Sequence, residues 1–342
     1  MLDQQIFPGH CTSCLPPSVF EQEQTSDMNP KPSRTPFLMI AVIFSLAAAT
    51  FSGCATQGIA PGPDLEPAGI PQYLAGTTFV YANGTWETVI AATPDKVTWK
   101  NHRGYISAGS PDFTYRRSEW QTRKRQGNRH FSPRTDISYP PATSLWPLAA
   151  EKGAAFRENG QWRETQGPEK TYTSIWSCEV QGTERVSVLA GEFDTWKIVC
   201  KRYAANRYGS ASKVKEVKTW YYAPEVNHPV LTTWRYTYAR PSKSVELMAV
   251  LPPENEFPSA ASARMKLSLQ KSLESNKRGK AVRWEVPSQG LAGQTVPLDT
   301  FQLENSVFCR RFVQEVRLVE EKRNYYGMAC RNPDGRWVVP RR

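Results

Sequence analysis

The sequence predicts a mainly β protein, with an antiparallel sandwich or partly open barrel followed by a small α+β C-terminal domain of one helix and an antiparallel sheet. Two observations predict this class. Residues 73–250 contain short runs of β-branched and aromatic residues separated by turn signals. Residues 262–342 open with a helical pattern and continue with further strand patterns. A chain of 342 residues is long enough for both domains.

The first β-rich domain is expected over 73–250. Turn signals such as Asn83-Gly84, Gln181-Gly182 and Ala190-Gly191 separate its runs. The predicted strands are Phe79–Ala82, Trp86–Ala91, Val97–Asn101, Phe113–Gln121, Thr171–Val180, Glu184–Leu189, Thr195–Tyr203, Val217–Ala223, Leu231–Ala239 and Val245–Val250. Such a series of short strands is typical of a sandwich or an antiparallel barrel.

A C-terminal domain over 262–342 is expected after a linker at 251–261. Met265, Leu269 and Leu273 lie four residues apart on one face of a helix that begins at Ser262. Gly279 follows the helix as a stop signal. The strands expected after it are Val282–Val286, Thr295–Leu303, Val307–Leu318 and Asn324–Arg331.

Residues 28–53 have the layout of a cleavable export signal. Basic residues precede the apolar run Phe37–Phe51, which closes with small residues. This run has 15 residues, whereas a bilayer-spanning helix needs roughly 20. Ala47-Ala48-Ala49 also suits ordinary secretory cleavage, so soluble secretion and a retained anchor are alternatives. We expect translation to begin at Met28, with 1–27 an upstream extension.

The end of the signal, Phe51-Ser52-Gly53-Cys54, resembles a bacterial lipobox. In a lipobox the cysteine thiol receives a diacylglyceryl group and signal peptidase cuts before it. Phe51 departs from the aliphatic residue that is usual at the first position. The resemblance implies lipidation at Cys54 and a membrane partner through its acyl chains. The Pro- and Gly-rich segment 54–72 then reads as a lipidated tether.

Four cysteines remain for disulfides once Cys11 and Cys14, before the signal, and the lipidated Cys54 are set aside. A hairpin over 307–331 places Cys309 opposite Cys330, within bonding distance. The second pair is Cys178 and Cys200. In a simple three-strand meander these two would be about 9–10 Å apart, which is too far for a bond. Either the middle segment does not lie between them, or the pair is not made.

The chain is basic, with a formal net charge of +11. Export argues against nucleic acid as a partner and leaves lipid head groups, lipopolysaccharide phosphates and cell-wall carboxylates as anionic partners. The alternative is that the charge serves solubility and is spread over solvated faces. One basic run is interleaved with aromatic residues and is a candidate site for an anionic glycan or lipid. Its residues are Arg116, Arg117, Trp120, Arg123, Lys124, Arg125 and Arg129. The alternative is a solvated hairpin whose aromatic side chains point into the core.

Catalytic motifs are absent from the sequence. There is no H-E-x-x-H, no G-x-S-x-G and no phosphate-binding loop, so no metal or cofactor is expected. Of the histidines, His228 precedes Pro229 in an apparent turn and is expected at the surface. The sequence therefore favours a non-enzymatic binding protein. The alternative is a periplasmic hydrolase or transferase that acts on cell-wall or lipid substrates, with a site assembled from scattered residues.

The C-terminal phrase Tyr326–Trp337, with Leu273-Glu274, Ala281–Trp284 and Cys309–Phe312, resembles the C-terminal domain of the bacterial 17 kDa surface-antigen lipoproteins. That resemblance implies an outer-membrane lipoprotein without established catalytic activity, whose domains lie in the periplasm or at the cell surface. This chain lacks the glycine-rich segment usual before that domain. The phrase Leu189–Thr195 and the later Thr219–Glu225 are similar to uncharacterised bacterial envelope β-proteins, to which no activity is attached.

Overall fold

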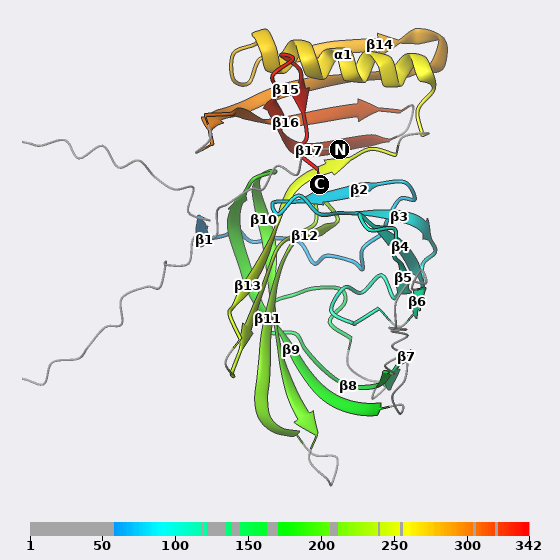
Figure 1. The fold of residues 1–342 in the computed structure, drawn as a ribbon, viewed down its shortest axis with the longest axis vertical. Helices are drawn as coiled ribbons and strands as arrows, with labels where there is room; N and C mark the ends of the chain where they lie inside the picture. The colour runs from blue at the N-terminus through cyan, green and yellow to red at the C-terminus, as the bar shows by residue number, and fades with distance from the viewer. Residues whose placement is uncertain are drawn as a thin grey trace, which may run out of the picture. The chain divides into compact units, whose positions relative to one another are not determined.

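The computed structural model describes residues 58–117, 119–121, 134–138, 144–162, 170–205, 211–238, 240–253, 256–303, 306–318 and 321–341. Within these residues the fold is mainly β, with one α-helix near the C-terminus, which confirms the predicted class (Figure 1). The elements of the first β-rich part are β1 (Ile59–Pro61), β2 (Thr78–Tyr81), β3 (Trp86–Ala92), β4 (Val97–Asn101), β5 (Ile106–Gly109), β6 (Glu119–Gln121), β7 (Arg134–Ser138), β8 (Gly153–Trp162), β9 (Lys170–Val188), β10 (Gly191–Ala205), β11 (Ala211–Ala223), β12 (His228–Tyr236) and β13 (Lys243–Leu251). The C-terminal elements are α1 (Ser259–Ser275), β14 (Val282–Val286), the 3₁₀ turn η1 (Pro287–Gln289), β15 (Leu291–Gln302), β16 (Phe308–Arg317), β17 (Lys322–Arg331) and β18 (Trp337–Val338).

Antiparallel pairing joins the strands of the first part in the order β7-β8-β9-β10-β11-β12-β13-β2-β3-β4-β5-β6. No ladder joins the two end strands, β6 and β7, within the described residues, so this sheet is not closed into a barrel. Strand β13 makes the corner, because its first half pairs with β12 and its second half with β2. Of the two predicted architectures, the pairing order fits the partly open barrel better than the sandwich.

The long strand β9 differs from the prediction and explains the first disulfide. Its residues were expected as two strands separated by a turn at Gln181-Gly182, but they form one strand that pairs with β10 on both sides of a bulge. Gly182 has a φ of 99°, which suits a bulge. Cys178 therefore lies directly opposite Cys200, and the two form a disulfide. No middle segment intervenes, which resolves the alternative that the sequence left open.

Two segments, the predicted strand Phe113–Gln121 and the predicted tether 54–72, differ from their predicted structure. Of the described residues of Phe113–Gln121, only Glu119–Gln121 form a strand. Asp112 Oδ1 accepts hydrogen bonds from the backbone N–H and the hydroxyl of Thr114 and so fixes a local turn before it. Part of the expected tether is also not extended away from the fold: Ile59–Pro61 pairs with β9, and Ala68 bridges Leu148.

The C-terminal part forms an antiparallel sheet in the order β14-β15-β16-β17-β18, and α1 packs on one face of it (Figure 1). Met265 and Leu273 of the helix are buried as the spacing predicts. Cys309 is paired in register with Cys330 and bonded to it, as expected. The helix begins at Ser259, and Phe257 from the expected linker is buried.

The core is shared between the two parts. One hydrophobic cluster contains Phe79, Phe193 and Leu231 of the first part together with Met265 and Tyr326 of the second. The Cys309–Cys330 disulfide lies in a further cluster with residues of β2 and β13. In the described part of the chain, no helix is both long enough and apolar enough to cross a membrane.

Candidate functional site

A cavity of about 430 Å³ is lined by residues of β2–β4 and of β11–β12. We call it the aromatic cavity. Its volume is in the range of about 300–1,000 Å³ found for small-molecule sites. Its walls combine aromatic rings with basic side chains. The residues used below are Tyr73, Tyr81, Glu87, Trp99, His102, Arg116, Arg117, Lys218, Trp220, His228 and Trp234.

His228, at the start of β12, is buried in the wall of this cavity and not at the surface, which corrects the prediction for it. Its imidazole stacks on Phe79 at 4.0 Å between ring centroids. Its Nδ1 lies 3.2 Å from the Tyr73 hydroxyl and its Nε2 3.2 Å from the Tyr81 hydroxyl. Burial, and then the positive charge of Arg117, lowers the pKa of His228 to about 3. The ring is therefore neutral at physiological pH.

A neutral imidazole has one donor and one acceptor nitrogen. One tyrosine hydroxyl therefore donates a hydrogen bond to His228, and the other accepts a hydrogen bond from the N–H group of the ring. The accepting tyrosine keeps a hydroxyl proton that the His228 ring does not use. Because Tyr73 and Tyr81 both line the cavity, the accepting tyrosine can donate a hydrogen bond to a ligand in the cavity.

Two arginines predicted from the basic run are brought to the cavity. Arg117 donates to both carboxylate oxygens of Glu87, at 2.8 and 2.7 Å, and its guanidinium lies 4.9 Å from the Trp99 ring centroid. Arg116 forms an ion pair with Glu158, whose side chain is only 1% exposed. The charge of each arginine is thus balanced by a carboxylate.

Lys218 on β11 supplies the third cation. Its Nζ lies 4.2 Å from the ring centroid of Trp220 and 4.9 Å from that of Trp234. Within the described part of the chain, no carboxylate forms an ion pair with this amine. Glu216, on the same strand, is paired with Arg202 instead. Burial lowers the pKa of Lys218 to about 7. Lys218 is therefore a cation whose charge is sensitive to its surroundings.

The structure describes only some of the residues that the sequence predicts for the site. Trp120 lies on β6, where its backbone pairs with Ser107. Arg123, Lys124, Arg125, Arg129 and the lipidation candidate Cys54 lie outside the described residues.

Sequence reasoning missed Lys218, although a signal was present. Glu216, Lys218, Trp220 and Tyr222 alternate along β11. Trp220 and Tyr222 belong to the buried core. Because alternate residues of a strand share a face, a lysine in that series points inward.

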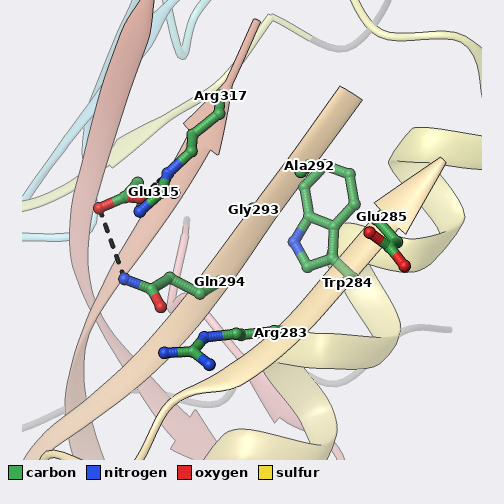
Figure 2. Close-up of a pocket in the computed structure, with 8 residues that line it drawn as sticks. All are labelled: Arg283, Trp284, Glu285, Ala292, Gly293, Gln294, Glu315 and Arg317. Carbon is green, nitrogen blue, oxygen red and sulfur yellow. Dashed lines mark hydrogen bonds and ion pairs between the residues drawn. The ribbon is translucent and has the colours of Figure 1, made fainter. Parts of the chain in front are cut away.

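A second hollow, of about 310 Å³, lies on the C-terminal sheet (Figure 2). Its charged residues include Arg283, Glu285, Glu315 and Arg317. Glu315 accepts from Arg317 at 2.6 Å and from Lys322 at 2.7 Å. Because its charges include both signs and its buried carboxylate is already paired, this hollow has less to offer a charged ligand than the aromatic cavity.

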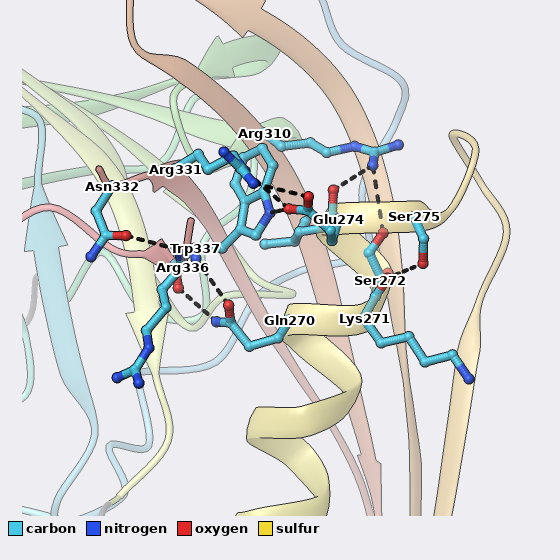
Figure 3. Close-up of polar contacts among 11 residues, drawn as sticks. Gln270, Lys271, Ser272, Glu274, Ser275, Arg310, Arg331, Asn332, Arg336 and Trp337 are labelled. Carbon is cyan, nitrogen blue, oxygen red and sulfur yellow. Dashed lines mark hydrogen bonds and ion pairs between the residues drawn. The ribbon is translucent and has the colours of Figure 1, made fainter. Parts of the chain in front are cut away.

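The residues of the C-terminal phrase form a polar network that fastens the chain end to α1 (Figure 3). Trp337 donates its backbone N–H to Gln270 and its indole N–H to Glu274, at 2.9 and 2.8 Å. Glu274 also accepts two hydrogen bonds from Arg331. Asn332 closes the turn over Asn332–Gly335 by accepting hydrogen bonds from the backbone N–H groups of Gly335 and Arg336. These residues are explained by the fold and need no ligand.

Arg310 completes the network from β16. Its guanidinium donates to the carbonyl oxygens of Leu273 and Asn276 at 2.9 and 2.6 Å, and lies 3.5 Å from that of Ser272. These carbonyls lie at the C-terminal end of α1. The last carbonyls of a helix lack partners within the helix, and a cation there is favoured by the helix dipole. Arg310 therefore serves as the cap of α1.

Comparison with known proteins agrees with the resemblance stated above for the C-terminal part. Residues 271–338 match the family of the 17 kDa outer membrane surface antigen. The 17 kDa surface antigen of Rickettsia prowazekii (strain Madrid E) is 35% identical over 75 residues, which are 22% of this chain and 47% of the relative. Those of Rickettsia felis (strain ATCC VR-1525 / URRWXCal2) and Rickettsia rickettsii are each 36% identical over 73 residues, 21% of this chain and 46% of the relative.

The C-terminal part is therefore a domain of the 17 kDa surface-antigen type. The chain spans about half the length of the curated relatives it matches. The family match runs from the last residues of α1 to β18 and contains none of the residues that line the aromatic cavity. No solved structure matches the chain.

Proposed function

We propose that this chain is a non-enzymatic, lipid-anchored protein of the bacterial outer membrane that binds an anionic envelope component. The surface-antigen-type domain supports an envelope or surface location. The lipobox-like end of the signal at Cys54 supports a lipid anchor. The proposal for binding is carried by one observation, the convergence of Arg116, Arg117 and Lys218 on an aromatic cavity.

The geometry of the cavity favours binding over catalysis. Both ring nitrogens of His228 are occupied by tyrosine hydroxyls. With its pKa near 3, this histidine is a poor general base at neutral pH. Asp112 is engaged by Thr114. Within the described residues, no serine or carboxylate is hydrogen-bonded to His228, so a nucleophile with its base is not assembled there.

Binding can be measured with the detergent-solubilised protein and isolated envelope materials. We expect it to sediment with peptidoglycan sacculi or with lipopolysaccharide vesicles, and to be released by high salt, because the attraction is between charges. Tryptophan emission should change on binding, because Trp99, Trp220 and Trp234 line the cavity. Chitin, which is uncharged, is the control. Equal binding to chitin, or failure to bind either anionic material, would contradict the proposal.

A further inference from the structure

We propose that Lys218 is the anion-binding group of the aromatic cavity, that its ligand is a small monoanion carried on a polar body, and that binding brings one proton into the cavity. The inference rests on the proposed function, since it names the ligand class and the control of the same site. The anionic group is a carboxylate or a phosphodiester, which share a single negative charge at neutral pH.

Charge balance within the cavity selects a monoanion. Glu87 and Glu158 already match the charges of Arg117 and Arg116. Among the described lysines and arginines that line the cavity, Lys218 is the remaining cation, and its amine contacts aromatic rings. One protonated lysine in a partly desolvated cavity is neutralised by one negative charge, whereas a second buried charge is costly.

The neighbours of that charge suit an oxygen anion. The unshared hydroxyl proton of the Tyr73–His228–Tyr81 set is a hydrogen-bond donor on the same wall. The guanidinium of Arg117 is close enough to affect the titration of both His228 and Lys218. An anion that enters therefore finds the Lys218 amine and a hydroxyl donor together, and the polar edges of the cavity remain for uncharged parts of the ligand.

Protonation of Lys218 is coupled to such a ligand. In the free protein, burial lowers the pKa of the amine, Arg116 and Arg117 act in the same direction, and Glu216 and Glu158 oppose them. The resulting pKa of about 7 leaves the Lys218 amine largely neutral above pH 7. A bound monoanion favours the charged amine and raises its pKa, so binding takes up a proton above pH 7. Affinity should therefore be level below pH 7 and fall as pH rises through it.

Other titratable groups face the same space. Glu87, Tyr73, Tyr81, Tyr115, His102 and His228 line the cavity with Lys218, and Cys200 and Trp234 are its partners on the neighbouring strands. His228 is neutral across the range concerned. Tyr73 and Tyr81 have pKa values raised by burial and keep their protons. His102 requires its own control, because it is the second histidine of the cavity wall.

The test is titration calorimetry on the full-length protein in detergent with two monoanionic probes. N-acetylmuramic acid carries the carboxylate and glycerophosphoglycerol the phosphodiester. N-acetylglucosamine, which lacks the lactyl carboxylate, is the neutral match of the first probe. We expect at least one monoanion to bind roughly tenfold or more tightly than the neutral sugar. Its affinity should fall about 50-fold from pH 7 to pH 9, with uptake of one proton at pH 9 measured across buffers of different ionisation enthalpy.

Variants separate the lysine from its surroundings. Lys218→Met keeps a flexible side chain between the tryptophan rings and should lose binding tenfold or more. Lys218→Arg keeps the charge at every pH and should bind without proton uptake. His102→Gln should retain the wild-type pH profile.

The outcomes distinguish the inference from the proposed function. Preference for the carboxylate probe identifies the cell wall as the source of the ligand, and preference for the phosphodiester identifies lipid. Binding that is unchanged in Lys218→Met, or that is independent of pH, overturns the inference while anion binding stands. If sacculi or lipopolysaccharide bind but neither small probe does, the inference is wrong and the proposed function is retained. If no anionic material binds, both are wrong.

Discussion

Arg310 is a buried cation whose partners are backbone carbonyls of α1 and not a carboxylate. Arg310→Ala should lower the free energy of unfolding by about 2–3 kcal/mol, because the carbonyls at the end of the helix lose charged donors while remaining buried. The stability of Arg310→Lys should lie between that of the wild type and that of Arg310→Ala, since a single amine cannot span the same carbonyls. Urea unfolding measures these differences.

A matched control for Arg310 lies in the same network. Arg336 is exposed, and its recorded contacts come from its backbone. Arg336→Ala should change the stability by less than about 0.5 kcal/mol. If Arg310→Ala were equally mild, the capping role would be wrong.

Gly293 on β15 shows a second residue fixed by packing. A Cβ at this position would lie 2.6 and 2.8 Å from two atoms of the Trp284 ring, and closer still to the carbonyl oxygen of Glu315. Gly293→Ala should therefore destabilise the protein by about 1–3 kcal/mol, because the ring and the strand must move apart. Gly69→Ala is the control, since nothing lies within 4 Å of a Cβ there. Thermal melting of the two variants tests this prediction, and equal melting temperatures would refute it.

At the residue scale, the sequence pointed to part of the candidate site. Arg116 and Arg117 were identified because basic residues cluster locally in the chain. His228 was not, because its partners Tyr73 and Tyr81 are more than 140 residues away in sequence. Contacts of that separation come from the sheet topology, and a local pattern carries no record of them.

At the scale of elements, alternation and turn signals predicted most strands near their observed positions. The strands β5, β7 and β8 were not predicted, and β9 was predicted as two strands, although Gln181-Gly182 is a bulge and not a turn. The two features require the same glycine conformation, with positive φ, so a local pattern does not distinguish them. What distinguishes them is the partner strand β10, which continues past the bulge.

The two disulfides brace different hairpins and offer a comparison at this scale. They span 22 and 21 residues and are buried in separate clusters. Replacing Cys309 and Cys330 together with serine should cost roughly 2–4 kcal/mol, because the cross-link restricts the unfolded chain. The Cys178/Cys200 double serine variant should cost a similar amount, since the loops are nearly equal. Calorimetry would measure both, and unchanged melting of the first would contradict its bracing role.

At the scale of the whole molecule, the C-terminal domain shares a hydrophobic core with the first sheet. Tyr326 of β17 packs edge-on to Phe193 of β10 and donates to Glu225. Arg311 donates to the carbonyl of Leu189. The sequence predicted two domains and a linker because composition changes near residue 251. The sequence could not predict the shared core, since the strands on each side of the contact have the same apolar pattern as any strand with a buried face.

The proposed lipid anchor depends on Cys54, which lies outside the described residues. Cys54→Ala should give a protein that carries no lipid and is recovered outside the membrane fraction. The reason is that two or three acyl chains on one residue hold a protein durably to a bilayer, whereas the described part of the chain offers no membrane-spanning helix. Intact mass and membrane fractionation are the measurements. The Cys11→Ala/Cys14→Ala variant is the control and should keep both lipid and location, because these cysteines precede the signal. Recovery of the Cys54→Ala protein in the membrane, with a mass that differs from wild type only by the substitution, would refute lipidation at this residue.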